Sequence, residues 1–105
     1  MGLFNLFNSP DINEGVQRHK LDGGVLLDVR TVEEYEEGHI PNSINIPLDR
    51  LYGINSVVQN KNEDIFVYCR SGRRSHTAAY ELKRLGYKNA KNIGGILSYT
   101  GVIEK

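Results

Sequence analysis

Cys69 is the only cysteine of this 105-residue chain, and its position favours a chemically reactive thiol. It directly follows the apolar run 65–68, which is typical of a strand, and a helical pattern over 75–85 comes next, ended by Gly86. Free backbone N–H groups and the helix dipole at such a junction stabilise a bound negative charge. The spacing therefore predicts a thiolate nucleophile at the carboxyl end of a strand.

The loop after Cys69 is rich in residues that stabilise an anion. Gly72 permits unusual dihedral angles, and the N–H groups of residues 71–75 can turn inward as a nest around the sulfur. Three arginines lie in this loop, and no acidic residue occurs before Glu81. We therefore expect every influence to lower the pKa of the thiol, and we expect Ser75 to cap the helix and to reach the sulfur through its hydroxyl. The predicted site has Cys69 as nucleophile and a binding loop of Arg70, Ser71, Gly72, Arg73, Arg74 and Ser75.

Two alternatives compete with this interpretation. A lone cysteine is commonly a small core residue, although a Gly/Arg/Ser loop directly after a strand argues against that here. A cysteine phosphatase needs an arginine after five intervening residues, so that its fork grips the phosphate. That position holds Ser75, and Arg74 comes one residue too early. The short loop suits a smaller anionic head, such as a sulfur atom carried on the cysteine.

The elements that must position this loop alternate along the chain. We expect a helix opened by Ser9-Pro10 and ending near Lys20, and a second helix over 32–37 with a capping box of Thr31 and Glu34. Helical residues should also follow Pro47, and a weak helix should end the chain. The predicted strands are 25–29, 43–46, 65–68 and 90–93. Strands that alternate with helices predict a parallel sheet covered on both faces, with ligands at the carboxyl ends of its strands.

Four ordered motifs give the chain a resemblance to the single-domain rhodanese, or thiosulfate sulfurtransferase, family. They are Leu27-Asp28-Val29-Arg30 with Glu34-Tyr35, Gly38-His39-Ile40-Pro41 through Asn45-Ile46-Pro47, the loop 68–75, and Gly94-Gly95. Asn42-Ser43 departs from a common Gly-Ala, Tyr99 stands where Trp is frequent, and the region after Gly95 is short. The resemblance implies a rhodanese-like α/β fold with about five parallel strands and helices on both faces. We expect a short N-terminal segment at 1–8 and a single domain at 9–105.

The resemblance also implies a sulfurtransferase. A Cys69 persulfide would carry sulfane sulfur from thiosulfate or a persulfide donor to cyanide, a thiol or a protein thiol. Arg73 or Arg74 would attract the small anionic donor, and Arg74 is preferred because it lies nearer the helix start. The alternative is a non-catalytic binding or regulatory module, a role in which members of the family typically lose the cysteine that this chain keeps.

Other polar residues are expected to support the structure. Asp28 and Arg30 should form an ion pair that fixes the strand end. His39 should hydrogen-bond to neighbouring backbone, because an ionised thiolate needs no general base. The acidic cluster Glu33, Glu34, Glu36 and Glu37 should form a solvated helix face.

Composition excludes several other classes. Thirteen basic and thirteen acidic residues balance, so neither nucleic acid nor a membrane surface is an expected partner. No apolar stretch approaches the ~20 residues that span a bilayer. No metal site and no cofactor are expected. A single cysteine suits the reducing cytoplasm. Leu3, Phe4, Leu6 and Phe7 should pack on the core or mediate self-association, with the oligomeric state left open.

Overall fold

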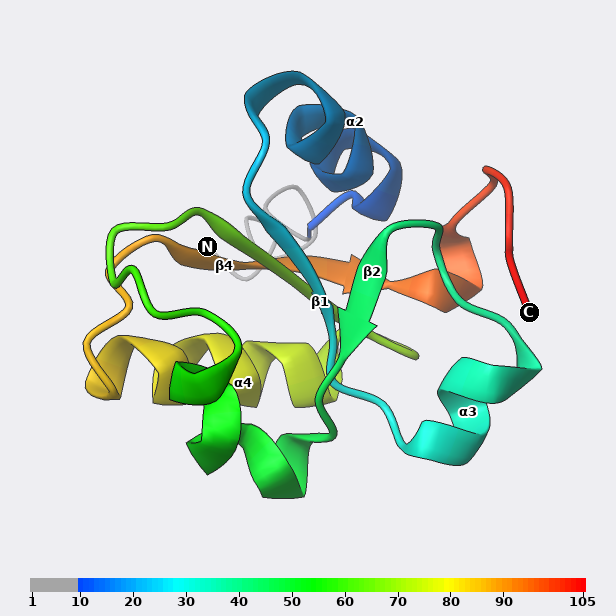
Figure 1. The fold of residues 1–105 in the computed structure, drawn as a ribbon. Helices are drawn as coiled ribbons and strands as arrows, with labels where there is room; N and C mark the ends of the chain where they lie inside the picture. Colours follow the sequence, from blue (N-terminus) through cyan, green and yellow to red (C-terminus); the bar gives the residue numbers. More distant parts are fainter. Residues whose placement is uncertain (1–9) are drawn as a thin grey trace, which may run out of the picture.

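A parallel four-stranded sheet forms the centre of the molecule (Figure 1). The structure, a computed structural model, describes residues 10–105, so the expectation for the apolar residues 3–7 lies outside the described part. The strand order is β2-β1-β3-β4. The bounds are β1 Val25–Asp28, β2 Ser43–Asn45, β3 Ile65–Cys69 and β4 Ala90–Gly95. The α/β class is confirmed. The strand number within 10–105 is four rather than about five, because each of the four extended runs in the sequence pattern forms one strand and no other does.

Helices cover both faces of this sheet. Helix α2, Ile12–Asp22, lies on one face, and α4, Arg73–Arg84, lies on the other together with the 3-10 helix η1, Leu48–Ser56 (Figure 1). Successive strand residues point to opposite faces, so Leu26 and Phe66 join Ile12 in one buried cluster. Leu27 and Val67 join Leu82 in the other. Apolar packing on both sides explains why the strands read as continuous hydrophobic runs.

The first two helices within residues 10–105 begin with different capping groups. Asp11 is the N-cap of α2, and its carboxylate accepts a hydrogen bond from Asn13 N at 3.0 Å. Ser9 of the expected Ser9-Pro10 opening lies outside the described residues. Helix α3, Val32–Glu37, has the expected capping box: Thr31 Oγ1 accepts from Glu34 N at 3.1 Å. Glu34 Oε1 in turn accepts from Thr31 N at 2.9 Å. This box fixes α3 beyond the carboxyl end of β1.

Helix α4 starts two residues earlier than the sequence predicts. Its N-cap is Gly72, which has φ 101° in the left-handed region and no side chain of its own to cap the helix. The expected cap by Ser75 is therefore wrong. Glycine lets the chain turn into the helix at once, which places Ser75 in the first turn and buries it. At the other end of the chain, the weak helix is a single 3-10 turn, Ile96–Ser98.

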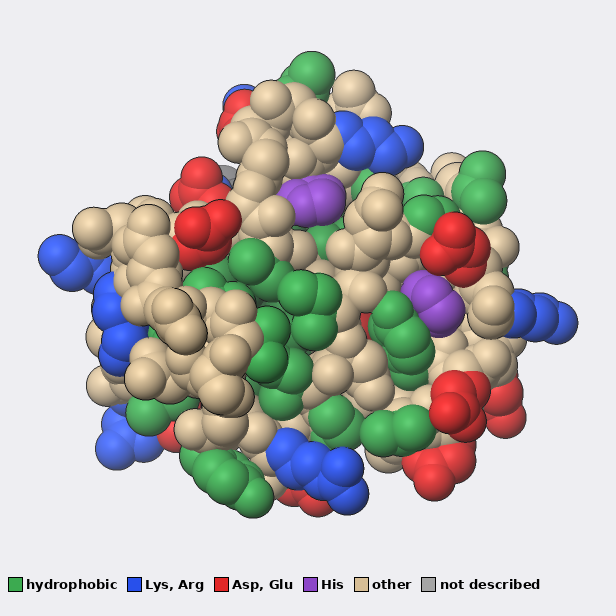
Figure 2. Space-filling view, in the orientation of Figure 1, with side chains coloured by type: hydrophobic (Ala, Val, Ile, Leu, Met, Phe, Trp, Pro, Cys, Tyr) green, Lys and Arg blue, Asp and Glu red, His purple; other side chains and the backbone are tan. Residues whose placement is uncertain are grey.

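The surface and helix lengths complete this picture. Acidic side chains gather over α3 in the space-filling view, where Glu33, Glu36 and Glu37 are exposed (Figure 2). Among residues 10–105, no helix combines the length and the apolar character needed to cross a bilayer.

Candidate active site

The site lies at the carboxyl ends of the strands, where the sheet meets the N-terminus of α4. Cys69 is the last residue of β3 and pairs with Gly95 at the end of β4. Asp28 ends β1 next to Tyr68 in the register. Because parallel strands bring their carboxyl ends to one edge, residues distant in sequence converge around the cysteine.

The Cys69 sulfur accepts hydrogen bonds from the loop that follows it. The donors are Gly72 N at 3.1 Å, Ser75 N at 3.3 Å and Ser75 Oγ at 3.3 Å. The expected reach of the Ser75 hydroxyl to the sulfur is therefore confirmed. Since these donors belong to the loop and first turn of α4, the sulfur occupies the place that a capping side chain usually takes.

Two opposing influences act on the acidity of this thiol. Burial raises the pKa of Cys69, and hydrogen bonds from Ser75, Gly72 and Ser71 lower it by more, so the pKa lies below its ordinary value. The expectation that every influence lowers the pKa is wrong for burial. The net direction is the one that favours a thiolate at neutral pH.

Cys69 is also part of the hydrophobic core. The residue is 0 % exposed and belongs to the same buried cluster as Val29, Leu51 and Ala78. One side of the sulfur thus faces hydrocarbon and the other faces N–H donors. The alternative of a small core residue accounts for the apolar side only, since a purely structural cysteine needs no such set of donors.

Glycines allow the loop to approach β4 closely. A Cβ on Gly95 would collide with the carbonyl oxygen of Arg70 and would lie 2.6 Å from the backbone of Ser71. A Cβ on Gly72 would meet Gly94 Cα at 3.4 Å. Gly94 and Gly95 therefore allow β4 to pack directly against the cysteine loop.

Asn92 is a site neighbour that sequence reasoning missed. Its Oδ1 accepts from Ser75 Oγ at 2.7 Å and from Gly94 N at 3.0 Å. Its Nδ2 donates to Gly72 O at 3.2 Å. The only signal in the sequence was a polar residue close to a glycine pair at the end of an expected strand.

Arg74 is engaged by a carboxylate that the sequence did not connect to it. Glu34 of α3 binds its guanidinium through two contacts, at 2.8 Å and 3.0 Å. The hydrogen bond from Arg74 is the main reason that the pKa of Glu34 falls to about 2. Glu34 is therefore an exception to the expected solvated face. By contrast, Arg70 and Arg73 are exposed and form no salt bridge to any residue in 10–105.

The predicted supporting residues surround the end of β1. Arg30 Nη2 lies 2.7 Å from Asp28 Oδ2, with both side chains buried, and also donates to Gly38 O at 2.7 Å. His39 stacks on Tyr35 with ring centroids 3.7 Å apart, and its Nδ1 lies 2.9 Å from Tyr35 O. These contacts match the expected ion pair and the expected backbone hydrogen bond, while the supporting role itself stays a prediction.

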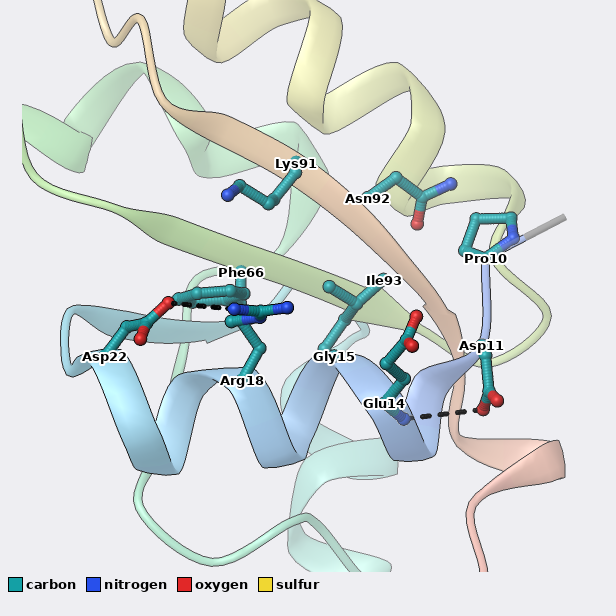
Figure 3. Close-up of a pocket in the computed structure, with 10 residues that line it drawn as sticks. All are labelled: Pro10, Asp11, Glu14, Gly15, Arg18, Asp22, Phe66, Lys91, Asn92 and Ile93. Atoms are coloured by element: carbon teal, nitrogen blue, oxygen red, sulfur yellow. Dashed lines mark hydrogen bonds and ion pairs between the residues drawn. The ribbon is translucent and has the colours of Figure 1, made fainter. Parts of the chain in front are cut away.

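Two surface hollows differ in their relation to Cys69. One of about 260 Å³ is lined by Val29, Pro47, Leu48 and Arg74, among others, so it adjoins the start of α4. Another of about 410 Å³ lies between α2 and β4 and is lined by Asp11, Arg18 and Lys91, among others (Figure 3). Cys69 lines neither hollow. In the described residues, no group of His, Cys, Asp and Glu side chains could hold a metal ion.

Comparison with known proteins assigns this arrangement to a family. A model of the rhodanese-like domain matches residues 12–101, which lie within the domain expected at 9–105. The chain belongs to the rhodanese-like domain family. A solved structure described as a rhodanese with anions, from E. coli, superposes on this rhodanese-like domain with a TM-score of 0.72. The two are 35 % identical, and the match covers 77 % of this chain and 96 % of that one.

Relatives of known name show similar identity over most of the chain. Thiosulfate sulfurtransferase PspE of Escherichia coli strain K12 is 39 % identical over 71 residues, which are 67 % of this chain and 68 % of PspE. YrkF of Bacillus subtilis strain 168, named as a candidate sulfur carrier protein, is 36 % identical over 104 residues. That match covers 95 % of this chain but spans only 56 % of YrkF. The rhodanese-like domain thus corresponds to about half of this longer relative.

Proposed function

We propose that this rhodanese-like domain is a sulfurtransferase that carries sulfane sulfur as a persulfide on Cys69. The observation that carries the proposal is the sulfur of Cys69 held by Gly72 N, Ser75 N and Ser75 Oγ at 3.1–3.3 Å. Relatives named for sulfur transfer or sulfur carriage support it. The backbone N–H donors that favour a thiolate, Gly72 N and Ser75 N, can also stabilise the anionic outer sulfur of a persulfide.

The transfer proceeds in two balanced steps. The Cys69 thiolate attacks the outer sulfur of thiosulfate, a new S–S bond forms, and the old S–S bond breaks as sulfite leaves with the electron pair. A thiophilic acceptor then attacks the outer sulfur of the persulfide and restores the thiolate. Cyanide leaves as thiocyanate, and a thiolate leaves as a persulfide. Neither step requires an outside oxidant, and the kinetics are ping-pong.

Exposed arginines at the loop attract the anionic donor in this proposal. Arg74 is already paired with Glu34, so its charge contributes little to the attraction of the thiosulfate dianion. Arg73 and Arg70 are exposed and unmatched within 10–105, and Arg73 lies in the first turn of α4. We therefore assign recruitment of thiosulfate to Arg73 before Arg74. The hollow beside Val29 and Leu48 offers space for the organic part of a thiol or persulfide.

A mass measurement tests the proposal directly. The purified chain, incubated with thiosulfate and desalted, is expected to gain the mass of one sulfur atom, and cyanide should remove it. Cys69→Ser is the matched control, because it keeps the loop and loses the attacking sulfur. An unchanged mass after incubation with both thiosulfate and an organic persulfide would reject the proposal.

A further inference from the structure

Asn92 connects β4 to the cysteine loop through a side chain that no motif marks. Its side chain extends toward the α4 side of the strand, whereas Ile93 points to α2 (Figure 3). The orientation of the amide is fixed at both ends. Gly94 N–H can only donate, so it faces Oδ1. Gly72 O, which also accepts from His76 N, can only accept, so it faces Nδ2. A carbonyl oxygen is therefore directed at Ser75 Oγ, 2.7 Å away.

The Ser75 hydroxyl has one proton and more than one acceptor. The distance to Asn92 Oδ1, 2.7 Å, is typical of a good O–H···O hydrogen bond. Ser75 Oγ also lies 3.3 Å from Cys69 Sγ and 3.4 Å from Gly94 O. Ser75 is 0 % exposed, so its hydroxyl does not face bulk water. A single O–H cannot serve both Asn92 and the sulfur fully, and the two compete for it.

We propose that Asn92 is a positioning residue that takes the Ser75 hydrogen bond whenever Cys69 Sγ is not an anion. In the free thiolate, the hydroxyl turns to the sulfur, since a hydrogen bond to a charged acceptor is the stronger one. In the protonated thiol, the hydroxyl donates to Asn92 and can accept the S–H of Cys69. No proton leaves Ser75 in this exchange. Only the direction of its O–H bond changes.

The exchange matters for sulfur transfer, and this part of the inference rests on the proposed function. When the outer sulfur attaches to Cys69, the negative charge moves from Sγ to the outer atom. Sγ then becomes a weak acceptor, and Asn92 again offers the better partner. Asn92 thus favours the loaded state over the free thiolate. The buried hydroxyl keeps an acceptor in both states, the sulfur in the thiolate and Asn92 Oδ1 in the loaded state.

The charged groups around the sulfur do not replace this mechanism. Arg74 of α4 interacts with the charge of Cys69, but its main partner is Glu34 of α3. Asp28 and Arg30 at the end of β1 are paired with each other. Titration of the thiol against this fixed background therefore reports on the uncharged donors, including the Ser75 hydroxyl.

A double-mutant cycle on the thiol pKa tests the proposal. The ultraviolet absorbance of the thiolate is followed against pH in the wild type, Asn92→Ala, Ser75→Ala and the double variant, with Cys69→Ser as baseline. Asn92→Ala should lower the measured pKa by roughly 0.5–1 unit, because the hydroxyl is released to the sulfur. Ser75→Ala should raise the pKa, and the double variant should match Ser75→Ala. Asn89→Ala, an exposed asparagine just before the same strand, should leave the pKa unchanged.

The cycle has clear contrary outcomes. If Asn92→Ala raises the pKa, or shifts it equally with and without the Ser75 hydroxyl, Asn92 only shapes the loop and the proposal is overturned. If Asn92→Ala does not fold, Asn92→Asp replaces it. This substitution should raise the pKa of Cys69, and the increase should be larger when Ser75 is present than in the Ser75→Ala background. Equal shifts would again overturn the proposal. No sulfur donor is used, so this result is independent of the mass measurement.

Discussion

Two kinds of group act on Cys69 at the scale of single residues. Backbone donors come from Gly72 and Ser75, within six positions of the cysteine, and are therefore part of the loop that the sequence displays. Side chains that adjust the site come from farther away: Asn92 reaches Ser75, and Glu34 reaches Arg74 across 40 positions. The nearby donors bind the sulfur. The distant side chains bind the Arg74 charge and the Ser75 hydroxyl proton, and so limit how far each is available to the site.

The charge of Arg73, which no carboxylate within 10–105 pairs, leads to a prediction on donor preference. Arg73→Gln should lower kcat/KM for thiosulfate by about 5- to 10-fold and should change turnover of a neutral organic sulfur donor less. Arg74→Gln should affect thiosulfate less than Arg73→Gln does. Steady-state kinetics at low and high salt measure these effects, with Arg84→Gln at the far end of α4 as control. A larger loss for Arg74→Gln would return the recruiting role to Arg74.

The Glu34–Arg74 pair leads to a prediction on acid stability. The pKa of Glu34 is about 2 in the folded protein, below its ordinary value, so the ionised form stabilises the fold. This contribution is complete above about pH 4.5 and is lost as the pH falls toward 2. Glu34→Gln should therefore destabilise the protein by about 1 kcal/mol at neutral pH, after solvent screening of this partly exposed pair.

Urea unfolding along a pH series measures this difference. The wild type and Glu34→Gln should converge as the medium becomes acidic. Glu33→Gln is the matched control, because Glu33 is exposed on the same helix. A difference between wild type and Glu34→Gln that persists unchanged in acid would show that the carboxylate charge is not the cause.

At the scale of elements, the site depends on the close passage of β4 beneath the cysteine loop. Gly95→Ala places a methyl group against Arg70 O and the Ser71 backbone, neither of which can rotate away. We expect a loss of about 1–3 kcal/mol in stability and a raised thiol pKa, because the loop donors move off the sulfur. Gly53→Ala in η1 is the control, since a Cβ there meets nothing within 4 Å. Thermal unfolding and thiolate absorbance measure both effects, and an undisturbed thiol would contradict the prediction.

The sequence is sufficient for the elements wherever the determining contacts are local. The apolar runs, the Thr31–Glu34 capping box and the Gly/Arg/Ser loop each lie within a few neighbouring residues, and each forms where expected. The start of α4 was misplaced because the sulfur and Gly72 replace a conventional cap, which propensity does not register. Asn92 and the Glu34–Arg74 pair were missed because side-chain meetings across 17 and 40 positions exist only after the sheet is assembled.

At the scale of the whole molecule, one sheet serves two buried clusters. Strands β1 and β3 supply residues to both, such as Leu26 to one and Leu27 to the other. The two faces should therefore unfold together in a single transition. Leu82→Ala, at a 0 % exposed position, should lower the stability by about 2–5 kcal/mol, whereas Lys83→Ala should stay within about 0.5 kcal/mol. Circular dichroism and thiolate absorbance during urea unfolding should report the same midpoint, and separate midpoints would refute the shared sheet as the cause.

The complete burial of Cys69 has a kinetic consequence. Because Cys69 has no exposed area, a donor can reach its sulfur only when residues packed around it move. Attack by the donor would then compete with the return of these residues to the closed arrangement. At high donor concentration, the loading rate would level off at the frequency of opening. Chemically different donors would share this plateau, which makes the plateau a property of the protein and not of the sulfur compound it meets.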